Sequence, residues 1–389
     1  MSPRTRAIVM SISAPVIAFA ILGGFLGKVM AGDDTYQNLK VFDDVVSLIT
    51  SNYVEDVDVD EVMNGAMRGL ADGLDADSAY LSADDVKQIE DNTELPRGDV
   101  GIDLTRQYYL RVIAARDNSP AAKAGLRTGD YIRAIGDRPT REMSVWEGMR
   151  ALRGAPGSKV SLTVLRGNAA DPHVVELTRE TIPPSEVTGR IAAPGVGYVR
   201  ITAMDSTTAR QVKAHIDDLT RAGASKLIVD VRRTSGGTLD SGLAVARLFV
   251  PSGALAQRES KNGVKETIAT SAGDGSITMP VLVLVGTGTT GAAELFASAL
   301  AGNKRADLIG GRTIGRAAVQ TLIKLPDGSG LWLSTVRYLM PDGTPLHEKG
   351  LEPTVRVEEP ETVEFGQPAP TADPVLDKAL EHAAVKKAA

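Results

Sequence analysis

Residues 286–300 read GTGTTGAAELFASAL and follow the apolar run of residues 281–285, a place where a hydrolase can present a nucleophile on a turn that opens a helix. The chain contains no cysteine, so a thiol nucleophile, disulfide bonds and thiolate metal sites are excluded. Whether a hydroxyl of this stretch attacks a substrate decides whether the chain is an enzyme or a binding protein with the shape of one. Those hydroxyls belong to Thr287, Thr289, Thr290 and Ser298.

Histidine usage and charge exclude further classes of function. The chain has four histidines, and no two of them have the spacing of an H-x-x-x-H pair, so we expect no metal site and no cofactor. The formal net charge is -6, and no dense basic face with interleaved aromatic residues is visible. Nucleic acid is therefore not an expected partner.

The region around the opening stretch alternates between buried-strand and helical patterns, from about residue 187 to residue 358. This alternation predicts a mostly parallel sheet covered by helices, followed by antiparallel strands over residues 318–343 that a PDGSG turn joins. Sites in such sheets lie in loops at the carboxyl ends of the strands. Two loops stand out: RRTSGG at residues 232–237 and the opening stretch itself.

Two different textures precede this region. Residues 36–94 place apolar side chains at helical spacing and predict an amphipathic helical segment, with a possible homodimerisation surface. Residues 96–182 consist of short β-like runs and short helices, and the stretch SPAAKAGLRTGDYI at residues 119–132 is specific. In its order of elements this part resembles a PDZ domain.

In PDZ domains a peptide adds a strand to a sheet edge, and its terminal carboxylate rests on backbone N–H groups of a glycine-containing loop. Here the matching loop is RGDVGIDL. A spacer of the same shape that holds no ligand is the alternative. The peptide-binding residues that the resemblance implies are Gly98, Val100, Gly101, Ile102 and Leu104.

The amino terminus is apolar. Arg4 and Arg6 precede an uncharged stretch from Ala7 to Gly27, and Lys28 follows it. A helix of that length spans roughly 30 Å, the thickness of the bilayer hydrocarbon. Residues 1–31 are thus expected to be a signal peptide or a membrane anchor, and either places the chain in the cell envelope, inner-membrane anchored and facing the periplasm or secreted to it.

Several stretches follow one another in the order of a known family. After the helical start and the PDZ domain come YVRI, DVRRTSGG, GTTGAAEL, GRTIGRAAVQ, LSTVRYLMPDG and KGLEPTVRVE. Over about residues 36–358 the chain resembles the C-terminal processing (tail-specific) peptidases. The resemblance implies an α+β, α/β multidomain fold: the helical segment, the PDZ-like β domain, and an α/β peptidase-like core over residues 187–358 with a mostly parallel sheet plus antiparallel strands. The tail of residues 359–389 is expected to end in a short helix without identifiable chemistry.

Members of this family are serine endopeptidases that use a serine and a lysine, aided by a glutamine. When Glu294 is aligned with the glutamate that follows the family's serine, Gly291 occupies the serine position, Arg316 the lysine position and Gln320 the glutamine position. A glycine has no side chain to attack a carbonyl. A lysine becomes a base when burial lowers its pKa by about 3–5 units from about 10.4, whereas arginine starts near 13 and stays protonated.

The resemblance also implies an oxyanion-like set of backbone N–H groups from Gly236, Gly237 and Ala292. Together with the helix start at Gly291 and the cation of Arg316, these groups predict a positive pocket suited to a peptide carboxylate. Two plainer interpretations stay open: the glycines serve only a tight turn, and Arg316 is an inward structural partner of Glu294 or Asp240.

We therefore expect an exported, membrane-tethered pseudopeptidase that binds protein or peptide C-termini and regulates an active peptidase relative or acts as an adaptor. One alternative is an active serine-type endopeptidase with a displaced nucleophile. The other is a purely structural assembly component. The candidate hydroxyls and amines for a displaced mechanism are Thr289, Thr290, Ser298, Lys304 and Lys324.

Overall fold

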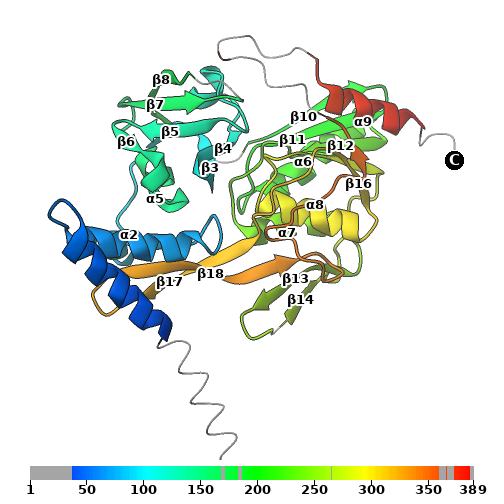
Figure 1. The fold of residues 1–389 in the computed structure, drawn as a ribbon. Helices are drawn as coiled ribbons and strands as arrows, with labels where there is room; N and C mark the ends of the chain where they lie inside the picture. Colours follow the sequence, from blue (N-terminus) through cyan, green and yellow to red (C-terminus); the bar gives the residue numbers. More distant parts are fainter. Residues whose placement is uncertain are drawn as a thin grey trace, which may run out of the picture. The chain divides into compact units, whose positions relative to one another are not determined.

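A computed structural model of the chain divides into two compact units, Met1–Leu70 and Ala71–Ala389, whose elements Figure 1 follows along the chain. Within the described ranges every helix is too short or too polar to span a bilayer. The apolar stretch Ala7–Gly27, expected to be a signal peptide or an anchor, lies outside those ranges. The structure describes residues 37–167, 171–182, 186–263, 265–358, 365 and 372–385.

The first unit contains, in its described part, a helix over residues 37–52 and most of α2 (Val59–Asp72). The Asp58 side chain starts α2, because its Oδ1 accepts hydrogen bonds from the amides of Asp60 at 2.9 Å and Glu61 at 3.2 Å. Such a cap satisfies amides that have no partner within the helix.

Near its start the second unit contains a short strand, which corrects the expectation of a helical segment over residues 36–94. Strand β1 (Ala79–Leu81) pairs antiparallel with β18 (Gly330–Leu339), in a sheet of order β1-β18-β13-β14. Strand β17 also pairs with β18, so the PDGSG turn joins the two strands that the sequence predicts. The remaining elements here are α3 (Ala83–Glu90), β13 (Ala254–Ser260), β14 (Lys265–Ala269) and β17 (Ala318–Lys324).

The PDZ domain is an antiparallel sheet of order β3-β4-β5-β7-β8, with β6 paired to β5. Helix α5 (Val145–Ala151) packs against β3, which is an edge strand of this sheet. The Ser144 and Glu147 side chains form a capping box that fixes the start of α5. The other elements are β2 (Gly98–Asp99), β3 (Ile102–Gln107), β4 (Tyr109–Ala115), α4 (Pro120–Lys123), β5 (Tyr131–Ile135), β6 (Arg138–Pro139), β7 (Lys159–Leu165), β8 (His173–Thr178) and β9 (Glu180–Thr181).

The core domain is built on a sheet of order β10-β11-β12-β15-β16-β19. Every pairing is parallel except that of β10 with β11, which fits the mostly parallel sheet that the sequence predicts. Its elements are β10 (Val187–Ala193), β11 (Val196–Ile201), α6 (Thr208–Arg221), β12 (Lys226–Asp230), α7 (Leu239–Arg247), β15 (Val281–Val285), α8 (Ala292–Gly302), β16 (Ala306–Gly310) and β19 (Val355–Arg356).

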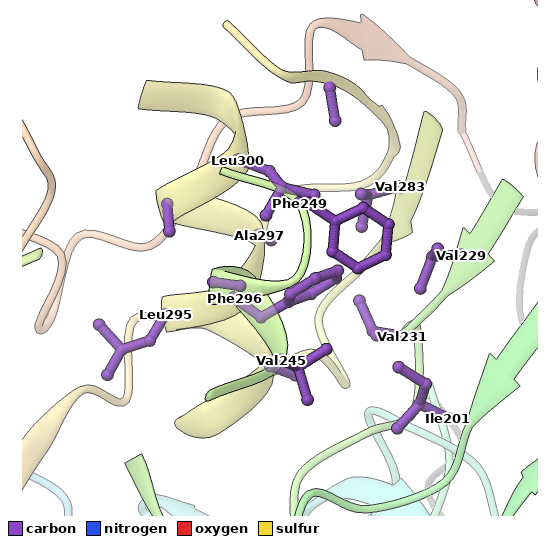
Figure 2. Close-up of a cluster of buried hydrophobic side chains, with 14 of the residues drawn as sticks. Ile201, Val229, Val231, Val245, Phe249, Val283, Leu295, Phe296, Ala297 and Leu300 are labelled. Carbon is purple, nitrogen blue, oxygen red and sulfur yellow. The ribbon is translucent and has the colours of Figure 1, made fainter. Parts of the chain in front are cut away.

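One face of this sheet is covered by α6, α7 and α8. Figure 2 shows Val229 and Val283 of the strands facing Phe249 and Phe296, two fully buried rings whose centroids lie 5.8 Å apart in an edge-to-face arrangement. Side chains along a strand alternate between faces. The neighbours of these valines, Ile228 and Leu284, therefore lie on the opposite face of the sheet and belong to a second apolar cluster. The sheet therefore needs a second cover.

That cover is α9 (Pro374–Val385), which lies in the tail expected to carry only a short terminal helix. Val375, Ala379 and Ala383 of α9 are buried against Ile228 and Leu284 on the second face. The helix exists as predicted, but it is part of the core domain rather than an appendage.

Candidate functional site

The two loops that the sequence singles out meet at the carboxyl ends of β12 and β15. The Thr290 amide donates a hydrogen bond to the Thr234 carbonyl at 3.1 Å, and the Thr289 hydroxyl donates to the Val231 carbonyl at 2.7 Å. Parallel strands bring their carboxyl ends to one edge, so the loops after neighbouring strands β12 and β15 become neighbours. Helix α8 starts directly after this junction.

Gly291 is the N-cap residue directly before α8, and its backbone angles are φ +59° and ψ -115°. Positive φ at this value is unfavourable for residues other than glycine. A Cβ at this position would nevertheless lie 3.6 Å from the Arg316 carbonyl oxygen and 3.9 Å from a Leu239 methyl group, which are ordinary contacts. The position thus has room for a side chain but carries none.

Glu294 connects the start of α8 to the segment that contains Arg316. Its fully buried carboxyl accepts hydrogen bonds from the amides of Gly291 at 3.2 Å, Gly315 at 2.7 Å and Arg316 at 2.7 Å, and from the Thr313 hydroxyl. Burial raises the pKa of Glu294 above its usual value, and these hydrogen bonds oppose that rise without cancelling it. The Glu294 side chain therefore holds the backbone of residue 291 close to that of residue 316.

Arg316 uses its guanidinium for a different partner than either one the sequence suggests. Its Nε donates to Asp77 Oδ1 at 2.7 Å and its Nη1 donates to the Leu104 carbonyl at 2.8 Å. Glu294 receives only the backbone N–H of Arg316, and Asp240 is not the partner. Asp77 lies just before β1, a strand that the sequence does not predict, and no sequence motif indicates its pairing with Arg316.

Removal from water lowers the pKa of Arg316, whereas the Asp77 carboxylate raises it, and the ion pair prevails. The pKa of Arg316 thus lies above the already high value of a free arginine. A proton acceptor must first be neutral, so the side chain at residue 316 acts as a fixed cation.

Gln320 lies on β17, where its Nε2 donates to the Ser334 hydroxyl of β18 at 3.1 Å. Gln320 and Ser334 are cross-strand partners in the antiparallel register. Its amide group is therefore positioned by the hairpin, at the end of the segment that starts with Arg316.

The glycines of the SGG loop have distinct roles. Gly237 has φ +117°, and a Cβ there would lie 1.8 Å from the Met204 carbonyl oxygen, so only glycine fits. The Gly236 carbonyl accepts from the Met204 amide at 2.9 Å. At least Gly237 is thus required by the turn itself. Ala292, the third member of the expected set, is buried in the first turn of α8.

Ser235, which directly precedes these glycines, joins the core to the edge strand of the PDZ domain. The Ser235 hydroxyl donates a hydrogen bond to Asp103 of β3, and Arg116 Nε lies 3.7 Å from the same carboxylate. Arg316 binds the next carbonyl along β3, that of Leu104. The oxyanion-like loop and the position of the expected base therefore both contact β3.

The PDZ loop holds the residues that the resemblance assigns to peptide binding. The Val100 and Gly101 amides donate to Asp99 Oδ1 at 2.7 and 3.0 Å, and the Gly98 amide donates to the Gly154 carbonyl at 3.0 Å. Ile102 and Leu104 point into the domain core and are at most 2% exposed.

Comparison with known proteins agrees with this architecture. The Peptidase family S41 profile matches residues 195–357, and a PDZ domain profile matches residues 111–166. The carboxy-terminal processing protease CtpA of Bacillus subtilis (strain 168) is 31% identical over 80% of this chain and 67% of its own length. The carboxy-terminal-processing protease of Bartonella bacilliformis is 30% identical over 84% of this chain and 76% of its own.

This chain belongs to the C-terminal processing peptidases. The structure of the photosystem II D1 C-terminal processing protease superposes with a TM-score of 0.68 at 25% identity, covering 82% of this chain and 92% of that one. The mixed fold of helices, PDZ domain and peptidase-like core that the sequence predicts is thereby confirmed.

The hydroxyls that a displaced mechanism in this family member would use are already engaged or enclosed. Thr289 Oγ1 donates to Val231 and accepts from the Gly286 amide at 3.1 Å, so it serves the loop scaffold. Ser298 is 1% exposed within α8. The Lys324 amine is engaged by Glu90 at 2.7 Å.

Proposed function

We propose that this C-terminal processing peptidase homologue is a pseudopeptidase that binds peptides without hydrolysing them. The observation that carries the proposal is the pair formed by Gly291 and Arg316. The first has no side chain at the start of α8, and the second is a cation bound to Asp77. Acyl transfer needs both an attacking group and a base that takes its proton, and these two residues supply neither.

The surroundings of this pair support binding in place of catalysis. The start of α8 carries the positive end of the helix dipole, a favourable place for an anion. The PDZ domain adds an edge strand, β3, to which an extended segment adds by backbone hydrogen bonds. The partners we propose are protein or peptide C-termini, including those of an active peptidase relative that this chain regulates.

A single assay tests binding and turnover together. The full-length chain in a non-ionic detergent is mixed with an unstructured substrate protein that carries a fluorophore near its C-terminus. Anisotropy reports binding, and the molecular mass of the recovered substrate reports cleavage. We expect saturable binding and an intact substrate after prolonged incubation. Cleavage that increases linearly with the concentration of this chain would contradict the proposal.

Glu294→Gln is a matched control for that assay, because the amide oxygen still accepts hydrogen bonds from the backbone of residues 291 and 316. If a contaminating protease causes the cleavage, the variant and the wild type preparations cleave alike after the same purification. If the cleft itself cleaves, the variant alters the rate, because the amide nitrogen replaces the oxygen that accepts from the Gly315 amide and the Thr313 hydroxyl beside Arg316.

We further propose that the chain is exported to the cell envelope and tethered through its amino-terminal apolar stretch, Ala7–Gly27. The length and lack of charge of this stretch support the proposal. Fractionation followed by protease treatment of spheroplasts tests it: the PDZ and core domains should be digested from outside, and their protection inside intact spheroplasts would exclude export.

A homodimer is proposed from the first unit considered alone. Several large apolar side chains there are exposed, and such surfaces mark protein interaction sites. Sedimentation of the full chain in detergent should give a dimer that Leu48→Asp dissociates, and a monomer at all concentrations would contradict it. The most exposed of these side chains in the described part of the unit are Leu39, Val41, Leu48, Tyr53, Val54 and Leu70.

A further inference from the structure

The loop that should receive a peptide's terminal carboxylate already holds a carboxylate of this chain. Asp99 is 7% exposed, and its Oδ1 accepts hydrogen bonds from the amides of Val100 at 2.7 Å and Gly101 at 3.0 Å. Its other oxygen, Oδ2, lies 3.5 Å from Nη2 of Arg153. The acidic side chain is therefore placed at the anion-binding amides of its own loop.

The backbone around Asp99 is fixed from several sides. Gly98 and Gly154 exchange two backbone hydrogen bonds of 3.0 Å, and Asp99 pairs with Glu180 in the short sheet of β2 and β9. Gly101 has φ +76°, and a Cβ there would lie 2.3 Å from the Cβ of Ser119, so the chain passes too closely for any other residue. The two amides thus keep their direction.

Each backbone N–H is a single donor. A peptide carboxylate that uses the amides of Val100 and Gly101 must therefore displace the Asp99 carboxylate from both. The displaced Asp99 carboxylate would stay close to the loop, because its short side chain is attached to the same backbone. It would then repel the peptide carboxylate, since like charges at short range repel. A peptide that lacks a free carboxylate meets no such competitor.

The rest of the groove does not depend on the loop. Strand β3 is the edge of its sheet, and among its backbone groups the Leu104 carbonyl is engaged by Arg316, so an added strand would use the other backbone groups of this edge. Helix α5 packs along the same strand, and the partly buried Met149 of that helix adjoins the apolar core. Strand addition along this edge needs backbone groups only, whether or not a chain end is present.

We propose that Asp99 is a built-in competitor for the terminal carboxylate of a peptide, and that it makes this PDZ groove accept extended segments with little preference for a free chain end. The proposal rests on the peptide binding proposed above and specifies its ligand class. A chain end still binds, but the loop contributes little to its affinity until Asp99 is removed.

The test compares two pools of fluorescein-labelled octapeptides, randomised over their last four positions among apolar residues, one pool with free C-terminal acids and the other with C-terminal amides. Apparent Kd values are measured by anisotropy with the full-length chain in a non-ionic detergent. We expect the wild type to bind both pools within about threefold of each other. We expect Asp99→Gly to bind the acid pool at least tenfold more tightly, with the amide pool unchanged.

Asp99→Asn is the matched control, because its side-chain oxygen still accepts from both amides but carries no charge. It should fall between the wild type and Asp99→Gly for the acid pool. Unfolding of Asp99→Gly would show as lost binding of the amide pool and a lower melting temperature. In that case Asp99→Asn decides: if it does not bind the acid pool more tightly than the wild type, the inference is overturned.

Other outcomes separate this inference from the function on which it rests. A wild type that already prefers the acid pool tenfold, or an Asp99→Gly variant that binds acids less tightly while retaining amides, overturns the role of Asp99 and leaves peptide binding intact. Absence of binding by the wild type and both variants to either pool contradicts the proposed function, and with it the inference.

Discussion

The contact between Arg316 and Asp77 leads to a prediction about variants that carry a serine at residue 291 and a lysine at residue 316. Replacing Gly291 by serine and Arg316 by lysine supplies a hydroxyl and an amine, but the amine would stand beside the Asp77 carboxylate, which is 8% exposed. An opposite charge at such range raises the pKa of a lysine by about 1–3 units. The double variant Gly291→Ser, Arg316→Lys should therefore be far less active than the same variant with Asp77→Asn added.

The magnitude follows from the neutral fraction of the lysine. If loss of the Asp77 charge lowers the lysine pKa by about 1–3 units, the neutral fraction at fixed pH below that pKa rises about 10- to 1,000-fold. The rate of reaction with a fluorophosphonate should rise by the same factor at pH 7. The lysine must be neutral to act as a base, so the labelling rates of the double and the triple variant both increase with pH. The triple variant should reach its half-maximal rate at a lower pH than the double variant.

Serine at residue 291 has to adopt the φ of +59° seen for glycine, at a cost of about 1–3 kcal/mol. Gly291→Ala with the same partner changes is the matched control, since it carries the same strain without a hydroxyl, and it should stay unlabelled. Equal labelling rates and equal pH midpoints for the double and triple variants would refute the reasoning about Asp77. Labelling of the alanine control would place the reacting group elsewhere.

Three further predictions concern the scaffold. Glu294→Ala should lower the free energy of unfolding in urea by at least about 3 kcal/mol, because three amides lose their acceptor, and Glu294→Gln should lower it less; equal losses would contradict the role of the hydrogen bonds. Arg232→Ala takes the ion-pair partner from the buried Asp230, which keeps the hydrogen bond from the Tyr198 hydroxyl, and it frees Asp373 at the start of α9. We therefore expect a loss of about 3–5 kcal/mol in the free energy of unfolding and increased binding of a hydrophobic dye, and an unchanged melting temperature would contradict it. Although burial acts to raise it, the pKa of Asp230 is lowered from 3.8 to about 2 by the hydrogen bonds and the charge of Arg232. The contribution of Asp230 to stability is therefore full above pH 4 and is lost as pH falls toward 2. The difference in free energy of unfolding between wild type and Asp230→Asn should shrink between pH 6 and pH 3, and a constant difference would refute this.

The order of strands and helices was predictable because each buried strand and amphipathic helix has its own local period. The alternation that ends at Val285 and resumes at Ala292 predicts a parallel strand, a turn and a helix without any distant contact. The PDGSG turn likewise predicts the hairpin of β17 and β18 by its turn residues alone.

Elements whose role depends on a distant partner were not predictable. Strand β1 is too short for a period, and only its pairing with β18 makes it a strand. Helix α9 carries an ordinary amphipathic pattern, and nothing local shows that it covers the second face of the sheet.

The candidate site divides in the same way. The positions of Gly291 and Arg316 follow from the order of motifs, but the partner of Arg316 does not, since Asp77 lies far away in sequence. Glu294 served only to align the motifs, although its fully buried carboxyl joins both positions. Asp99 lies in a loop whose glycines alone suggested peptide binding, so the sequence did not single it out. An acidic residue directly before the amides of an anion-binding loop was the signal that could have identified it.

The most direct test of the central claim is covalent labelling of the unmodified full-length chain by a fluorophosphonate, read by mass spectrometry of the intact protein and of its proteolytic peptides. With glycine at residue 291 and a charged arginine at residue 316, we expect the mass of the chain to stay unchanged under conditions that label an active serine peptidase completely. A stoichiometric adduct on Thr289, Thr290 or Ser298 would contradict it.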